Sequence, residues 1–126
     1  METDDSSLRF EASSRENWRK WLQAHHQTDR QIWLVLSRKG ASRPSVTYDE
    51  AVEEAICFGW VDSIVRRIDE ATYAQKFTPR KSGSTWSESN IERARRMMKE
   101  GKMTPAGREK LENRLPAPTE QLTADN

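Results

Sequence analysis

The spacing of apolar residues predicts a helix near the start of the chain. Trp18, Trp21 and Leu22 stand at positions i, i+3 and i+4, which places them on one face of a helix. Ser13 is followed three residues later by Glu16, the pattern of an N-terminal capping box. We therefore expect a helix that begins after Ser13 and packs its tryptophans inward.

The next segment, residues 31–37, predicts a strand. Leu34 points to one face of this segment, and Trp33 and Val35 point to the other. A strand with apolar side chains on both faces is typical of an inner strand that is covered on both sides.

A second helix is predicted between Thr47 and Gly59. Thr47 and Glu50 form another capping box, and Gly59 is suited to end the helix in the left-handed conformation. Between them, an apolar stripe that begins at Tyr48 alternates with acidic residues. We expect two of these acidic residues, Glu53 and Glu54, to face water.

Two further strands and two further helices complete the prediction. Residues 60–68 and 73–78 are separated by a turn short enough for a hairpin. Ser87 is a good N-cap for a helix that ends at Gly101, and Pro105 opens a last short helix. The sequence thus predicts an α+β fold, a single domain in which a small antiparallel sheet of about three strands packs with four helices.

Composition places this domain among small globular proteins. The 126 residues suffice for one domain. We expect it to span residues 10–114, with a disordered N-terminus at residues 1–9 and a disordered tail at residues 115–126. No apolar run is long enough for a membrane span and no secretory signal is recognised, so we expect a cytoplasmic protein that does not insert into membranes.

Basic residues concentrate in the middle of the chain. The whole protein has a net charge of +1, but residues 66–102 alone carry +5. Such a stretch attracts phosphate or an acidic partner, or is simply a solvated face. No cofactor or metal is expected: Cys57 is the single cysteine, and His25 and His26 are adjacent on a helix, so they cannot chelate one ion.

The segment 77–90 is the densest candidate for a binding site. It brings two cations, Arg80 and Lys81, together with Trp86 just before a helix N-terminus, where backbone N–H groups hold anions. The same residues also have a structural interpretation, in which they cap, staple and turn the chain. The predicted ligand-binding residues are Trp60, Asp62, Arg66, Arg80, Lys81, Ser84, Trp86, Ser87 and Asn90.

Asp62 is the one carboxylate in an unexpected place. It follows Trp60 and Val61 inside a predicted strand, where aspartate is disfavoured. It either forms an ion pair with Arg66 or Arg80, or faces a ligand. An enzyme is not supported by this sequence, since no catalytic residue is assigned and acid–base work by Asp62 would need an open cleft.

Several motifs together resemble a known family. Thr47-Tyr48-Asp49-Glu50-Ala51, Cys57-Phe58-Gly59-Trp60-Val61-Asp62, Phe77-Thr78-Pro79-Arg80 and Trp86-Ser87-Glu88-Ser89-Asn90 look like those of the YdeI/OmpD-associated (bacteriocin-protection) family, over residues 10–111. The resemblance implies a bacterial protein of stress or bacteriocin resistance and supplies no catalytic residues.

Two functions follow from the sequence. The first is a small binding module that holds an anionic or phosphorylated molecule, or single-stranded nucleic acid, at the loop and helix N-terminus formed by residues 80–90. The alternative is a protein-interaction module, in which the basic helix over residues 87–100 binds an acidic protein partner and no small ligand.

Overall fold

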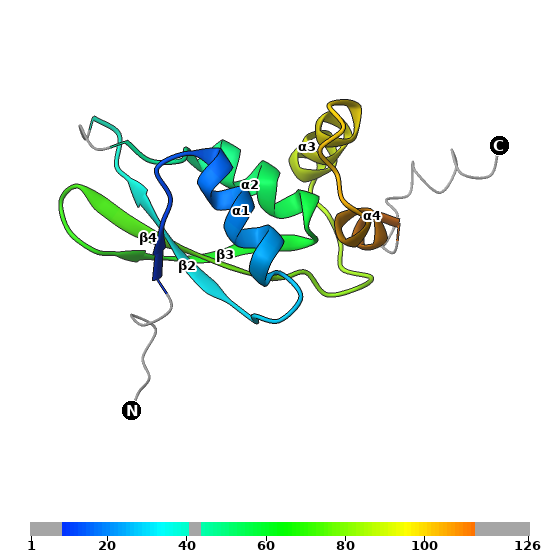
Figure 1. Ribbon diagram of the computed structural model, residues 1–126, viewed down its shortest axis with the longest axis horizontal. Coiled ribbons are helices and arrows are strands. Elements are labelled where there is room, and N and C mark those ends of the chain that lie inside the picture. Colours follow the sequence, from blue (N-terminus) through cyan, green and yellow to red (C-terminus); the bar gives the residue numbers. More distant parts are fainter. Residues whose placement is uncertain (1–8, 41–43, 113–126) are drawn as a thin grey trace.

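The computed structural model describes residues 9–40 and 44–112. It confirms the α+β fold, with four helices and a mixed sheet of four strands (Figure 1). The predicted tail at 115–126 and all but Arg9 of the predicted N-terminal segment lie outside the described residues. The elements are β1 (Arg9–Glu11), α1 (Arg15–His25), β2 (Ile32–Ser37), α2 (Tyr48–Cys57), β3 (Trp60–Arg67), β4 (Thr72–Pro79), α3 (Glu88–Lys99) and α4 (Pro105–Glu112).

The sheet has the strand order β1-β2-β4-β3. β1 was not predicted, because a strand of three residues is too short to show a period. It pairs in parallel with β2, while β4 is antiparallel to both β2 and β3. The predicted inner position of β2 is confirmed, since β1 and β4 flank it.

The hydrophobic core lies on one face of the sheet. α1 and α2 lie over this face (Figure 1), and the core there includes Trp18, Leu34 and Trp60, each nearly inaccessible to solvent. On the opposite face, the buried ring of Trp33 is covered by cationic side chains rather than by a helix: the Arg66 guanidinium lies 4.6 Å and the Lys76 ammonium 5.8 Å from the ring centroid.

The helix ends follow the predicted chemistry with one shift. The capping box of Thr47 and Glu50 is present, and Ser87 caps α3 by accepting a hydrogen bond from the Asn90 backbone N–H at 3.2 Å. The first helix begins one residue later than predicted, since Ser14, not Ser13, accepts from the backbone N–H of Asn17.

Gly59 joins α2 to β3 and lies beside the residue that follows β4. Its φ of +77° lies in the left-handed region, which glycine adopts without strain. Its carbonyl oxygen accepts a hydrogen bond of 2.8 Å from the backbone N–H of Arg80, directly after β4. The turn at Gly59 therefore holds the start of the 80–90 loop against the end of α2.

Candidate functional site

Arg80 is buried without a carboxylate partner. Only 6% of the residue is exposed, and its side chain makes one hydrogen bond in the described part of the chain, from Nη1 to the Ser84 hydroxyl at 3.3 Å. Its Nε–H is buried and has no hydrogen-bond partner there. Burial lowers the pKa of the Arg80 guanidinium, and the negative charge of Asp62 opposes that change. Most of the five N–H donors of this guanidinium therefore have no partner among the residues that the structure describes.

Trp86 supports the Arg80 guanidinium from one side. The Arg80 Cζ lies 4.0 Å from the centroid of the Trp86 ring, a close cation–π contact. The indole Nε1–H of Trp86 is itself buried without a hydrogen-bond partner among the described residues. Because this ring is buried and packed against Arg80, it is not an open platform on which a nucleic-acid base stacks.

Asp62 does not neutralise Arg80. Its Oδ2 accepts a hydrogen bond of 2.7 Å from the hydroxyl of Tyr48, at the first turn of α2. No ion pair between Asp62 and Arg80 occurs, although the Asp62 charge acts on the guanidinium. Burial, and after it the hydrogen bond to Asp62, raises the pKa of Tyr48 to about 12, so Tyr48 stays protonated at neutral pH.

Tyr48 is the residue of this cluster that sequence reasoning missed. It looked like the start of the apolar stripe of α2, yet 40% of the residue is exposed. A signal was available in the sequence. Asp62 is disfavoured in a strand and therefore needs a hydrogen-bond partner, and α2 is the element that directly precedes β3 in the chain.

The predicted site residues divide into three groups. Asp62, Arg80, Ser84 and Trp86 belong to the cluster just described. Ser87 and Asn90 form the first turn of α3, where the Asn90 side-chain oxygen also accepts a hydrogen bond of 3.1 Å from Arg93. The remaining three lie elsewhere, and these are Trp60, Arg66 and Lys81.

Each of these three has a different environment. Trp60 is a core residue: its ring meets Trp21 edge-on at 5.7 Å, and its Nε1 donates to the His26 carbonyl. It also borders a hollow of about 400 Å³ that the α1–β2 turn shares with α4, but no other predicted site residue lines that hollow. Arg66 covers Trp33 on the opposite face of the sheet, and Lys81 is exposed to solvent.

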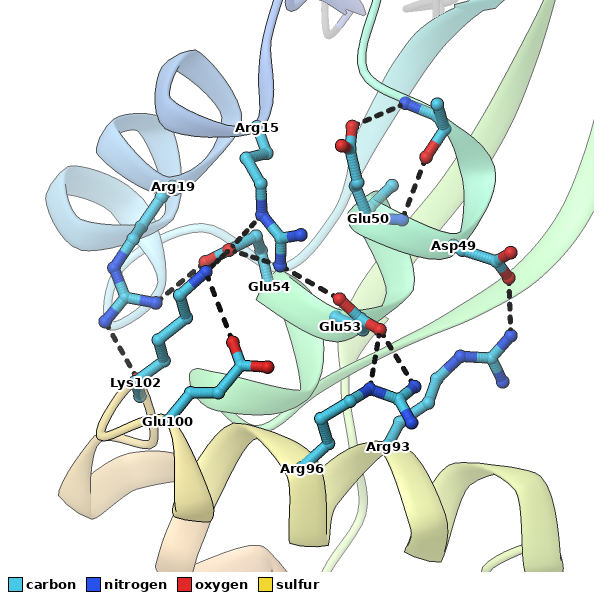
Figure 2. Close-up of polar contacts among 12 residues, drawn as sticks. Arg15, Arg19, Asp49, Glu50, Glu53, Glu54, Arg93, Arg96, Glu100 and Lys102 are labelled. Atoms are coloured by element: carbon cyan, nitrogen blue, oxygen red, sulfur yellow. Dashed lines mark hydrogen bonds and ion pairs between the residues drawn. The ribbon is translucent and has the colours of Figure 1, made fainter.

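The basic residues of α3 contact acidic residues of the same chain. Arg93 pairs with Asp49 at 2.7 Å and Arg96 pairs with Glu53 at 2.9 Å, both across the α2–α3 interface (Figure 2). Arg95 reaches Glu92 on its own helix at 3.7 Å. Part of the predicted basic surface is therefore an internal contact that docks α3 on α2.

Glu53 and Glu54 do not face water, contrary to prediction. Glu54 is 1% exposed, and its carboxylate forms ion pairs with Arg15 at 2.8 Å and with Arg19 at 2.7 Å, both from α1 (Figure 2). Arg15 also forms an ion pair with Glu53, at 3.0 Å. The sequence pattern showed acidic residues beside an apolar stripe, but not that arginines of two other helices would cover them.

Comparisons with known proteins place the chain in a family. A family described as "Domain of unknown function (DUF8412)" matches residues 10–110, and the chain belongs to that family. No curated protein and no solved structure matches it. The resemblance to the YdeI/OmpD-associated family is therefore wrong, and the stress and bacteriocin roles that it implied lose their basis.

Two further findings concern the described residues alone. No helix within 9–40 and 44–112 is long and apolar enough to cross a membrane. In the same ranges, no three histidine, cysteine or acidic side chains come together in an arrangement that could hold a metal ion.

Proposed function

We propose that this DUF8412 domain is a binding module for a small anionic ligand, whose charged group is held by Arg80. The observation that carries the proposal is the burial of a guanidinium that forms no ion pair within the described chain. A buried charge without a partner destabilises a fold by several kcal/mol in general. A ligand anion would supply the missing partner and form charge-assisted hydrogen bonds with the fork of the guanidinium.

The surroundings of Arg80 favour a small ligand over nucleic acid. The Trp86 ring is buried beneath the guanidinium, and Arg93 and Arg96 are already paired with acidic side chains of α2. A protein that follows a phosphate backbone needs several free cations along a groove. The alternative function is the docking of an acidic protein on the basic residues of α3. The ion pairs of Arg93 and Arg96 leave fewer cations on α3 for such a partner.

The binding test compares anions on the full chain. We expect inorganic phosphate or acetate to give saturable binding by isothermal titration calorimetry or amide NMR. Short single-stranded DNA should bind no more tightly, per phosphate group, than inorganic phosphate does. Arg80→Gln should abolish the binding. Lys81→Gln, which removes the neighbouring exposed cation, should reduce it by less than about twofold, as is typical of a screened surface charge.

Folding of the variants is checked separately, because Arg80 is buried. Arg80→Lys keeps the charge and should retain weak binding, since an ammonium lacks the fork geometry of a guanidinium. Binding that survives in Arg80→Gln with a native circular dichroism spectrum would contradict the proposal.

A cytoplasmic location is also part of this proposal, resting on composition alone.

A further inference from the structure

The face of the sheet away from α1 and α2 carries cations on both sides of Trp33. Trp33 on β2 is paired with Arg9 on β1 and with Lys76 on β4, and side chains paired in this way point to the same face. Phe10 and Leu34, the next residues along β1 and β2, point to the other face and join the core beneath the two helices (Figure 1). Trp33 itself is not part of that core.

Arg66 adds a third cation to this face from β3. Its guanidinium lies 4.6 Å, and the Lys76 ammonium 5.8 Å, from the centroid of the Trp33 ring. Trp33 is only 2% exposed, so these long side chains form the outer layer that a partner meets. Within the described sheet, the strands place one acidic side chain on this face, that of Glu11. The surface is therefore positively charged.

Three donors on this face have no acceptor among the described residues. Arg9 and Lys76 form no ion pair within 9–40 and 44–112. The indole Nε1–H of Trp33 is buried and has no hydrogen-bond partner in those ranges either. Buried donors in native proteins nearly always have an acceptor, and a bound partner is one source of it. All three groups fit a partner that brings negatively charged oxygen atoms.

The spread of the cations favours a protein segment over a small anion. Neighbouring strands lie about 4.8 Å apart, so the backbones of Arg9 and Lys76, two strands apart, are separated by about 10 Å. Acidic residues three positions apart in an extended segment span about the same distance. Single-stranded nucleic acid stacks its bases on open aromatic rings, whereas the Trp33 ring is covered by the Arg66 guanidinium.

We infer that this face of the sheet is a docking surface for an acidic segment of a partner protein, whose carboxylates pair with Arg9, Lys76 and Arg66. An oxygen atom of the same segment accepts the hydrogen bond of the Trp33 Nε1–H. Exposed ion pairs are individually weak and are screened by salt, so we expect a modest affinity that falls as salt rises. The surface shares no residue with the Arg80 site, so the two functions are tested independently.

The test titrates the full chain with hexaglutamate, and with hexalysine as the probe of opposite charge. Hexaglutamate should bind saturably at low salt and shift the Trp33 Nε1–H signal of a ¹⁵N-labelled protein, while hexalysine should not. The double variant Arg9→Gln/Lys76→Gln should weaken binding about tenfold, because an exposed ion pair contributes up to about fivefold. Lys20→Gln/Lys99→Gln is the matched control: it removes the same charge from exposed positions on α1 and α3 and should weaken binding less than about twofold.

Several results would overturn the inference. Hexaglutamate could fail to bind at low salt, or the two double variants could weaken its binding equally, which would indicate a general charge effect. Single-stranded DNA of the same charge could shift the Trp33 signal when hexaglutamate does not, in which case the partner is a nucleic acid. Binding that Arg80→Gln abolishes and Arg9→Gln/Lys76→Gln leaves unchanged would place the peptide at Arg80 instead, and the proposed function there would stand.

Discussion

The substitution Glu54→Gln tests whether the buried ion cluster stabilises the domain. Glu54 is 2% exposed at its side chain and accepts charge-assisted hydrogen bonds from Arg15 at 2.8 Å and Arg19 at 2.7 Å. Glutamine keeps the shape, but it removes the negative charge and turns an amide N–H₂ toward one of the two arginines. The variant therefore leaves Arg19 without a carboxylate partner among the described residues and leaves Arg15 with Glu53 alone.

The size of the effect follows from these contacts. Breaking a buried ion pair by removing one partner destabilises a protein by about 3–5 kcal/mol. The Arg15 and Arg19 side chains are 21% and 25% exposed, so water recovers part of that loss. We expect about 3 kcal/mol, which at a urea m-value of ~2 kcal/mol/M lowers the unfolding midpoint by about 1.5 M.

Urea unfolding followed by tryptophan fluorescence measures this midpoint. Glu92→Gln removes the exposed carboxylate that pairs with Arg95 and should change the stability by less than about 0.5 kcal/mol. A Glu54→Gln midpoint within 0.3 M of the Glu92→Gln midpoint, an allowance of about 0.6 kcal/mol at the same m-value, would show that the cluster contributes no net stability and refute the reasoning.

Three other predictions concern single groups. Since the pKa of Tyr48 is raised to about 12, the protonated form of Tyr48 stabilises the fold below about pH 10 and this contribution disappears as pH rises through 12; ultraviolet titration of a Tyr73→Phe protein should show the high pKa, and Asp62→Asn should lower it. Burial raises the pKa of Cys57 to about 11, so its thiol should not react with a disulfide reagent at pH 8 until urea unfolds the chain; rapid reaction of the native protein would contradict this. An added Cβ at Gly107 would overlap the carbonyl oxygens at the end of α2, so Gly107→Ala should destabilise the domain by about 1–3 kcal/mol in thermal unfolding, and an unchanged midpoint would show that α4 does not pack closely there.

Local rules predicted most of the fold. The capping box at Thr47, the N-cap at Ser87, the glycine turn at Gly59 and the two-faced strand β2 each depend on neighbours within a few residues, and the structure contains all four. β1 was missed because its three residues owe their strand conformation to pairing with β2, and such long-range pairing leaves no period in the sequence.

The candidate site was only partly predictable for the same reason. The segment 77–90 signalled Arg80 and Trp86 correctly as neighbours, because they are close in the chain. The contact of Tyr48 with Asp62 crosses from α2 to β3, and the burial of Glu54 depends on two arginines of α1. Contacts between separate elements depend on how the helices dock, which sequence spacing does not determine.

The central claim is that the Arg80 guanidinium is an anion-binding group, and its own N–H signal tests this most directly. The Nε–H of Arg80 and the indole N–H of Trp86 have no hydrogen-bond partner in the described chain, so both resonances report changes at the guanidinium. In a ¹⁵N-labelled protein titrated with acetate and with inorganic phosphate, at least one of the two anions should shift both signals in a saturable way that high salt weakens. If both signals stay unchanged up to the highest concentration of every probe, Arg80 is a structural residue and the proposed function is wrong.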